Sequence, residues 1–299
     1  MKKYVRDLRV TENIRLHENY VLIKLTDSIP LPEMQPGQFA EIRVDHSPTT
    51  FLRRPISINF VDQQKNEIWF LIQMVGDGTR CLAEVKKGDN VNVLFPLGKG
   101  FSILSDTSKK ALLIGGGVGT APMLFLGEQL RLKGFSPCFL LGARSAKDLL
   151  QLSEFEKYGK VYVTTEDGSR GERGYVTSHT ILSEESFDMI YTCGPKPMMV
   201  AVAKYAKEHG IDFIICDHHV PDDTLPEAYA ILNPKMDDNT YPYPHLSGCG
   251  VGFKFMQAFA KSNGLTNQNE LFSLLDLVAV SIAADIVPMT GENRVMTYY

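Results

Sequence analysis

A glycine-rich turn carries the strongest chemical signal in the sequence. The segment LLIGGGVGTAP, residues 112–122, joins an apolar stretch to an expected helix that opens with Ala121 and Pro122. Backbone without side chains can turn sharply and approach a pyrophosphate, whose charge is met by free amides and by the positive end of the following helix. A plain structural turn between a strand and a helix uses the same residue types. The residues that would hold phosphate are Gly115, Gly116, Gly117, Gly119 and Thr120.

Two further segments combine residue types that can hold a phosphate. FLRRPISINF, residues 51–60, places Arg54 where it can reach a phosphate while the backbone after it lies against a flat ring. MVGDGTRCL, residues 74–82, places Gly78 and Thr79 before an expected helix, where amides and a hydroxyl can do the same. Taken alone, an edge strand with a solvated arginine pair and a plain turn also explain these segments. The backbone that would face the ring belongs to Pro55, Ile56 and Ser57.

A different chemistry is indicated by KEHGIDFIICDHHVPDD, residues 207–223. An apolar segment that is typical of a strand runs into Asp217, His218 and His219. Carboxylate and imidazole groups are metal ligands, so the triplet indicates a possible metal site. The simpler interpretation is a charged loop.

The elements that must position these residues change character near residue 100. Short runs rich in Val, Ile and Phe between residues 20 and 97, such as YVLIKLT and EIWFLIQMV, predict the strands of a small antiparallel β-barrel or sandwich. Strand-like and helix-like stretches then alternate, which predicts a parallel sheet with covering helices, one of them over KDLLQLSEFEKYG at residues 147–159. We predict an antiparallel β-barrel domain at 1–101, a Rossmann-like parallel α/β nucleotide domain at 102–208 and an incomplete α/β segment at 209–299.

Composition bounds the function. The chain has 299 residues, of which 44% are apolar and 22% charged, and a net charge of -4, so it shows no electrostatic basis for binding nucleic acid or an anionic membrane. No apolar stretch resembles a signal peptide or a membrane span, which predicts a cytoplasmic protein. The cysteines lie far apart and are odd in number, so they predict neither a disulfide framework nor a metal knuckle. They are Cys81, Cys138, Cys193, Cys216 and Cys249.

The three phosphate-type segments, in this order and followed by Cys-Gly-Pro, resemble the ferredoxin-NADP reductase superfamily. TFLRRPISI, VGDGT, LIGGGVGTAPM, TTEDGSRGERGYVT and YTCGPKPMM are similar, more narrowly, to the electron-transfer subunit of NAD-dependent dihydroorotate dehydrogenase. The resemblance covers residues 1–208. It implies an oxidoreductase of pyrimidine biosynthesis that passes electrons between NAD(H) and FAD, with an FMN-containing catalytic subunit as its partner.

The resemblance also implies a role for each barrel motif. Arg54 to Ser57 would face the FAD ring and phosphates, with Ser57 near the flavin N5. Gly78 and Thr79 would hold the FAD pyrophosphate. Hydride would pass between nicotinamide C4 and flavin N5, so the protein mainly stacks two rings at contact distance and needs no general base.

For the nucleotide, the resemblance implies that the turn at 115–119 binds the phosphates and that NAD is preferred. The local residues leave the choice between NAD and NADP open. The strand PCFLLGAR ends in Arg144, which can accommodate a 2′-phosphate, whereas Glu166 and Asp167 would disfavour one if they lie close. The residues expected beside the nicotinamide are Cys193, Gly194 and Pro195.

The resemblance breaks after residue 208. In that family four closely spaced cysteines follow and ligate a [2Fe-2S] cluster, the relay to the partner. This chain has only Cys216 and Cys249 there, and they lie 33 positions apart in the sequence. Two cysteines cannot supply four thiolates. We therefore expect the cluster to be absent.

The segment that stands in its place is similar to the DHH phosphoesterases of the RecJ exonuclease type. GIDFIICDHHVPDDTLPEAYAILNPK, LSGCGVGFKF and LLDLVAVSIAADIVPMTGENR have counterparts there in the same order. The resemblance implies that His218, with or without His219, and Asp285 belong to a two-metal centre that activates water. The upstream aspartates of such a centre have no counterpart in residues 1–208. A metal-dependent phosphoesterase or single-strand exonuclease fragment and a non-functional chimera are therefore the alternatives.

Overall fold

The structure is a computed structural model that describes residues 2–98, 100–103, 105–211, 214–216, 230–236, 240–264 and 269–298. The chain divides into two compact units, residues 1–202 and residues 203–299. Each unit is described by itself. Within the described residues no helix combines the length and the apolar character that crossing a membrane requires.

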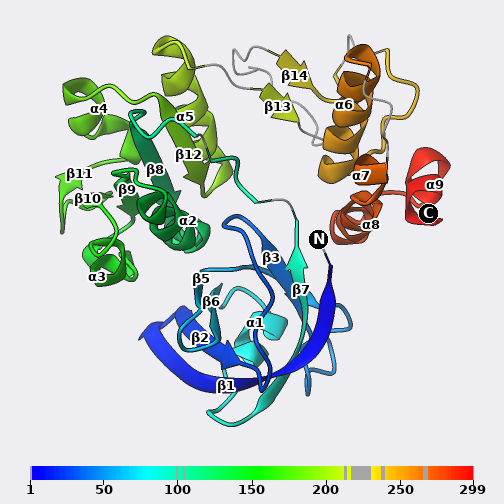
Figure 1. The fold of residues 1–299 in the computed structure, drawn as a ribbon, viewed down its shortest axis with the longest axis horizontal. Helices are drawn as coiled ribbons and strands as arrows, with labels where there is room; N and C mark the ends of the chain where they lie inside the picture. Colours follow the sequence, from blue (N-terminus) through cyan, green and yellow to red (C-terminus); the bar gives the residue numbers. More distant parts are fainter. Residues whose placement is uncertain are drawn as a thin grey trace. The chain divides into compact units, whose positions relative to one another are not determined.

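The first unit begins with a seven-stranded antiparallel sheet that curls into a half-barrel (Figure 1). In β1, buried side chains such as Leu8 and Val10, at 0% and 1% exposure, alternate with more exposed ones, whereas β2 and β6 are buried along most of their length. The strands run in the order β4-β3-β7-β1-β2-β6-β5. They are β1 (Tyr4–His17), β2 (Tyr20–Thr26), β3 (Phe39–Ile42), β4 (Arg54–Ser57), β5 (Phe60–Asp62), β6 (Glu67–Gln73) and β7 (Asn90–Leu97), and helix α1 (Asp77–Leu82) lies between β6 and β7.

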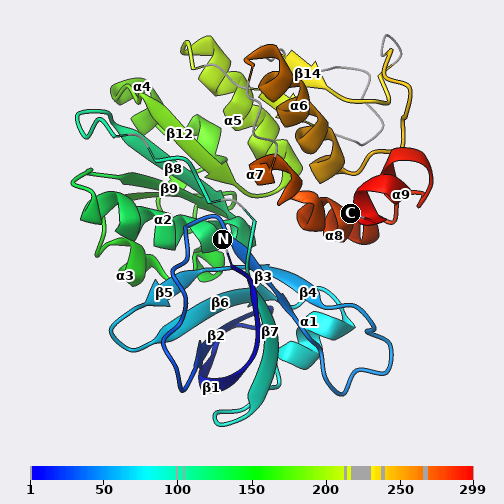
Figure 2. The ribbon, with the colours of Figure 1, turned by 45° about the vertical axis from the view of Figure 1, so that its right-hand side comes forward.

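A five-stranded parallel sheet with helical connections completes the first unit. Figure 2 shows β8, β9 and β12 side by side, in agreement with the order β11-β10-β9-β8-β12. The strands are β8 (Ala111–Gly116), β9 (Cys138–Ala143), β10 (Lys160–Thr165), β11 (Glu172–Arg173) and β12 (Met189–Cys193). The connections are η1 (Gly117–Thr120), α2 (Ala121–Leu132), η2 (Ala146–Asp148), α3 (Leu152–Phe155), η3 (Val176–Ser178), α4 (Ile181–Glu184) and α5 (Lys196–Glu208), the last of which runs into the second unit.

The strand order reverses at β8. From β8 the chain goes to β9 on one side, and β12 later returns to the other side. In open α/β sheets, ligands bind outside the carboxyl ends of the strands at such a switch point. The glycine-rich turn follows β8, so the fold places it at the position where a nucleotide is expected.

The second unit pairs a short parallel ribbon with a group of helices. Its core consists of apolar side chains such as Val251, Val278 and Ile282, each at most 5% exposed. The elements are β13 (Ile214–Cys216), β14 (Ala230–Leu232), α6 (Gly248–Ser262), α7 (Asn269–Phe272), α8 (Leu275–Ala284) and α9 (Gly291–Tyr298).

Candidate flavin and nucleotide site

The glycine turn after β8 folds back on itself. Gly117 has a φ of 55°, a left-handed conformation that glycine adopts without strain. The Thr120 hydroxyl donates a hydrogen bond of 2.9 Å to the Gly117 carbonyl, which closes the turn. A Cβ on Gly115 would lie 2.9 Å from Thr120 Cα, so that position admits no side chain. The turn leads directly into α2, whose start at Ala121 confirms the expected helix.

The Cys-Gly-Pro segment lies against this turn. Cys193 ends β12 and pairs with Gly115 across the sheet. A Cβ on Gly119 would overlap the Cys193 carbonyl and lie 2.5 Å from Gly194 Cα. The two predicted nucleotide segments, 79 residues apart between Gly115 and Gly194, therefore touch through their backbones, with no space for a side chain between them.

Two side chains complete this part of the site. Burial raises the pKa of the Cys193 thiol and so favours its protonated form at neutral pH. Met198, in the first turn of α5, lies beside both segments: its Sδ is 2.5 Å from a Cβ built on Gly116, and its Cε is 2.5 Å from one built on Gly194. Sequence reasoning missed Met198, because methionine in an apolar helix gives no chemical signal.

In the barrel, the two consecutive arginines have different surroundings. Arg53 donates to the carbonyls of Glu41 and Asn92 at 3.2 and 3.1 Å and also to the Asn92 side chain. The Arg54 guanidinium makes no hydrogen bond or ion pair with the described residues. β4 is an edge strand, as the simpler interpretation of this segment expects, but only Arg54 keeps its guanidinium available for a ligand.

The Gly-Asp-Gly-Thr segment, residues 76–79, lies beside the aliphatic part of the Arg54 side chain. A Cβ on Gly78 would lie 3.1 Å from Arg54 Cδ and 3.0 Å from Thr50 Cγ2. The Thr79 hydroxyl accepts from the amide of Gly76 at 3.1 Å and donates to its carbonyl at 3.0 Å. Helix α1 begins at Asp77, so Gly78 and Thr79 lie inside its first turn rather than before it.

A buried carboxylate, that of Glu41, interacts electrostatically with Arg54. Glu41 is only 7% exposed and lies opposite Pro55 in the β3–β4 pair. Burial raises the pKa of Glu41, and the positive charges of Arg54 and Arg53 partly offset that effect. Removing the charge of Arg54 therefore also affects the protein without its ligand.

The groups that bear on the choice of nucleotide lie at neighbouring strand ends. The amide of Asp167 donates to the carbonyl of Arg144 at 3.2 Å, and the amide of Glu166 donates to the carbonyl of Ala143 at 3.1 Å. Both acids thus follow β10 where it runs beside the end of β9. The backbones of Glu166 and Asp167 therefore lie beside the end of β9, where Arg144 follows.

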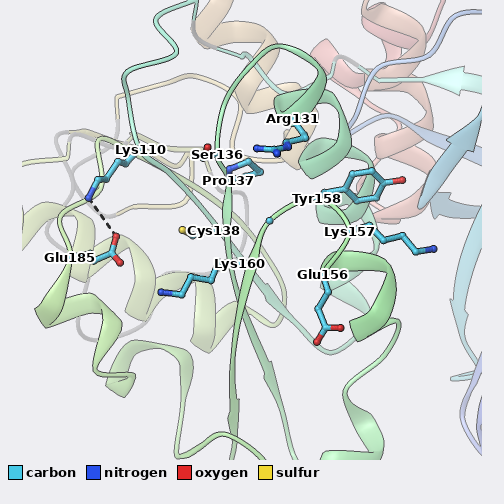
Figure 3. Close-up of a pocket in the computed structure, with 11 residues that line it drawn as sticks. Lys110, Arg131, Ser136, Pro137, Cys138, Glu156, Lys157, Tyr158, Lys160 and Glu185 are labelled. Atoms are coloured by element: carbon cyan, nitrogen blue, oxygen red, sulfur yellow. Dashed lines mark hydrogen bonds and ion pairs between the residues drawn. The ribbon is translucent and has the colours of Figure 1, made fainter.

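A hollow of about 500 Å³ lies at the amino ends of the parallel strands, opposite the carboxyl ends that carry the glycine turn (Figure 3). It is lined by residues at the starts of β9 and β10, among them Cys138 and Lys160. Lys110 in its wall is paired with Glu185 at 3.5 Å, and Figure 3 shows Lys157 directed away from the other basic groups. Its position at the amino ends of the strands separates this hollow from the nucleotide segments.

In the second unit, Asp285 has a structural role. Its Oδ2 accepts hydrogen bonds from the Gly248 amide at 3.2 Å and the Ser281 hydroxyl at 3.1 Å, at the start of α6. Asp217, His218 and His219 lie outside the described residues. The described residues contain no group of three or more His, Cys, Asp or Glu side chains that could hold a metal ion. With two cysteines in residues 209–299, the donor set does not fit a four-thiolate cluster either.

The fold belongs to the class of ferredoxin-reductase-like proteins, in which a barrel and a parallel α/β sheet share one chain. The structure of an NADH-dependent reduced ferredoxin-NADP oxidoreductase superposes with a TM-score of 0.62 at 26% identity, covering 81% of this chain and 83% of that one. The flavohaem-like FAD/NAD binding domain of nitric oxide dioxygenase from Vibrio cholerae shares the fold at 22% identity, with a TM-score of 0.60 and coverage of 69% and 94%.

Sequence relatives narrow the class. The dihydroorotate dehydrogenase B (NAD(+)) electron transfer subunit of Fusobacterium nucleatum is 36% identical over 211 residues, 69% of this chain and 82% of its own length. That of Shouchella clausii is 40% identical over 237 residues, 78% of this chain and 80% of its own. The chain belongs to the family of dihydroorotate dehydrogenase B electron transfer subunits.

A second family also matches. The model of the DHH family, N-terminal domain, matches residues 147–282. This confirms the resemblance seen in the DHH segment, but the match begins well before residue 209, in η2 between β9 and β10 of the first unit.

Proposed function

We propose that this chain is the flavoprotein subunit of a dihydroorotate dehydrogenase, which exchanges electrons between NAD(H) and FAD. The observation that carries the proposal is the contact of the glycine turn with the Cys193–Gly194 backbone at the switch point of the sheet. A parallel sheet that needed only a tight turn would not require a second glycine, Gly194, directly after β12 at the same place. Membership of the electron transfer subunit family supports the same function.

For FAD, the barrel offers a phosphate site and an open strand edge. We assign the pyrophosphate to Gly78, Thr79 and the Arg54 guanidinium, since Gly78 and Arg54 lie together and no protein group occupies that guanidinium in the described structure. The backbone from Pro55 to Ser57 would lie along the flavin ring. These residues bind and orient the ring, and Ser57 would hold a hydroxyl near the flavin N5.

For the nicotinamide nucleotide, we assign the phosphates to the turn at Gly115–Thr120 and the start of α2. Cys193, Gly194 and Pro195 would lie beside the nicotinamide. The acids Glu166 and Asp167 would select NAD over NADP, because their charge disfavours a 2′-phosphate near Arg144.

When bound, the two cofactors supply a hydride donor and a hydride acceptor. The residues of the chain contribute position and an environment from which water is excluded. The Cys193 thiol, kept neutral by burial, adds an apolar contact and takes no proton.

The remaining assignments are also proposals. We divide the chain into an FAD-binding domain at 1–101, an NAD-binding domain at 102–208 and a DHH-like fragment at 209–299. The partner would be the FMN-containing catalytic subunit. Because the cysteines after residue 208 do not fit an iron-sulfur cluster, no electron step is assigned to one.

The visible spectrum of the purified protein tests the proposal. We expect flavin bands, including one at about 450 nm that bleaches when NADH is added without oxygen. NADPH at the same concentration should bleach it much more slowly. A protein that contains no flavin after purification and takes up none when FAD is supplied would overturn the proposal.

The DHH match supports one second candidate, a metal-dependent phosphodiesterase in residues 209–299. This function needs Asp285 as a ligand, although its Oδ2 already accepts two hydrogen bonds at the start of α6. Cleavage of single-stranded DNA that requires Mn²⁺ and is lost in His218→Ala would favour it. Equal activity of the variant and the parent protein would exclude it.

A further inference from the structure

Asn59 is a fully buried polar residue in the connection between the two edge strands of the half-barrel. Its exposed fraction is 0%. The edge strands β4 and β5 follow one another in the chain, and only Ile58 and Asn59 join them. The Ile58 amide donates to the Gln38 carbonyl at 3.0 Å, and the Asn59 amide donates to the Trp69 carbonyl at 2.9 Å. The barrel therefore fixes the backbone at Asn59.

The side chain of Asn59 points out of the barrel into the parallel α/β part of the unit. Its Nδ2 donates to the carbonyl of Ala121 at 2.9 Å, and its Oδ1 accepts from Gln151 Nε2 at 3.0 Å. Gln151 has a φ of 55°, a left-handed conformation that residues other than glycine rarely adopt. Such a conformation persists where the surrounding structure holds it, and the bond to Asn59 is part of that surrounding.

Both ends of this link adjoin proposed cofactor segments. Asn59 follows Ser57 by two residues, and Ala121 follows Thr120 of the glycine turn. The contacts beside the link are apolar: the rings of Phe60 and Phe125 have centroids 6.1 Å apart. Apolar contacts are not directional and allow small shifts, whereas the two amide hydrogen bonds fix a direction and a distance.

We propose that Asn59 is a positioning residue that fixes the glycine turn relative to the flavin-facing strand, and so sets the distance over which hydride passes. The inference rests on the proposed function. Loss of the link should change the rate of transfer more than the affinity for NADH, because Asn59 lies next to the cofactor segments rather than on them.

The test compares Asn59→Ala with Asn13→Ala. Asn13 is a matched control: its Nδ2 donates to the carbonyls of Ala83 and Val85 at 2.9 and 2.7 Å, entirely within the barrel. Both variants lose two hydrogen bonds of one side chain. Stopped-flow bleaching of the flavin against NADH concentration gives a limiting rate and an apparent Kd. We expect Asn59→Ala to lose about tenfold or more in the limiting rate, with the apparent Kd changed much less, and Asn13→Ala to retain the rate.

Hydrogen exchange provides a readout that does not depend on activity. Amides of residues 117–124 should exchange faster in Asn59→Ala than in the parent protein, and at the parent rate in Asn13→Ala. If Asn59→Ala does not fold, Gln151→Ala removes one bond of the link from the other side and should show both effects in smaller measure. Equal limiting rates in the two asparagine variants, or a loss confined to Kd, would overturn the inference. A parent protein that never bleaches would instead refute the proposed function, while the exchange measurement still decides on the link.

Discussion

Substituting Gly119 by alanine is the sharpest test of the nucleotide site. The new Cβ would lie 2.5 Å from Gly194 Cα and closer still to the Cys193 carbonyl, whereas ordinary contact begins at 3.4 Å. The obstructing atoms are backbone at the end of β12, so no rotamer change relieves them. The turn must retreat by roughly 1 Å, at a cost of about 1–3 kcal/mol of stability. A displacement of that size at a site of hydride transfer should slow transfer by about 10- to 100-fold.

The assay is the limiting rate of flavin bleaching by NADH, with the flavin content measured on the same sample. Gly119→Ala should retain FAD, because the assigned FAD residues are in the barrel, and should lose rate. Gly252→Ala is the control: nothing lies within 4 Å of a Cβ at that position in α6, so it should leave the rate unchanged. A Gly119→Ala protein with the parent rate and a normal unfolding midpoint would refute the assignment of the turn.

Three further outcomes follow from the described contacts. Arg54→Gln should weaken the affinity for FAD, measured by its retention in ultrafiltration, by roughly 10- to 100-fold. Arg54→Lys keeps a positive charge near Glu41 and should lose less affinity. Full retention of FAD in both variants would contradict a phosphate contact. Burial lowers the pKa of His179 below its ordinary 6.5, so stability is full above that pH and declines as the pH falls toward the folded-state pKa. His179→Gln should flatten this decline in urea unfolding at a series of pH values, and an unchanged slope would assign it to other groups. Asp285→Ala should lower the stability of the second unit by about 0.5–2 kcal/mol through loss of the bond from Gly248, with Mn²⁺ making no difference; stabilisation by Mn²⁺ of the parent alone would restore a metal role.

Much of the barrel could be predicted because its strands carry short apolar runs. YVLIKLT corresponds to β2 without change, and EIWFLIQMV contains β6. The expected strands began only at Tyr20, so β1 was missed, although it is central in the sheet. In β1 the buried Leu8 and Val10 alternate with charged or polar residues, because one face of this strand meets water while both of its edges are paired. The length of apolar runs does not identify such a strand, whereas a search for apolar residues at every second position would have identified it.

The segment KDLLQLSEFEKYG shows where tertiary structure overrides a helical pattern. A single helix was expected there, but the structure has only η2 and the short α3. Gln151 takes a left-handed conformation between them and directs its side chain to Asn59. Neither residue stands out in the sequence, because an amide has no chemical signature and its partner is 92 residues away. The cofactor motifs could be predicted from local spacing, whereas the link between them could not.

The junction of the two family patterns lies at an ordinary helix end. After α5, the Ile211 amide donates to the Ala206 carbonyl at 2.8 Å and the Gly210 amide to the Lys207 carbonyl at 3.0 Å. Gly210 has a φ of 73°, which completes a Schellman motif. This ending depends only on glycine and on the backbone of the preceding turn, so any α/β sequence can follow it with an apolar strand such as β13. In the described residues up to Ile211, the change from one family pattern to the other therefore coincides with a regular helix end, and the chemistry of each pattern must be judged on its own ligands.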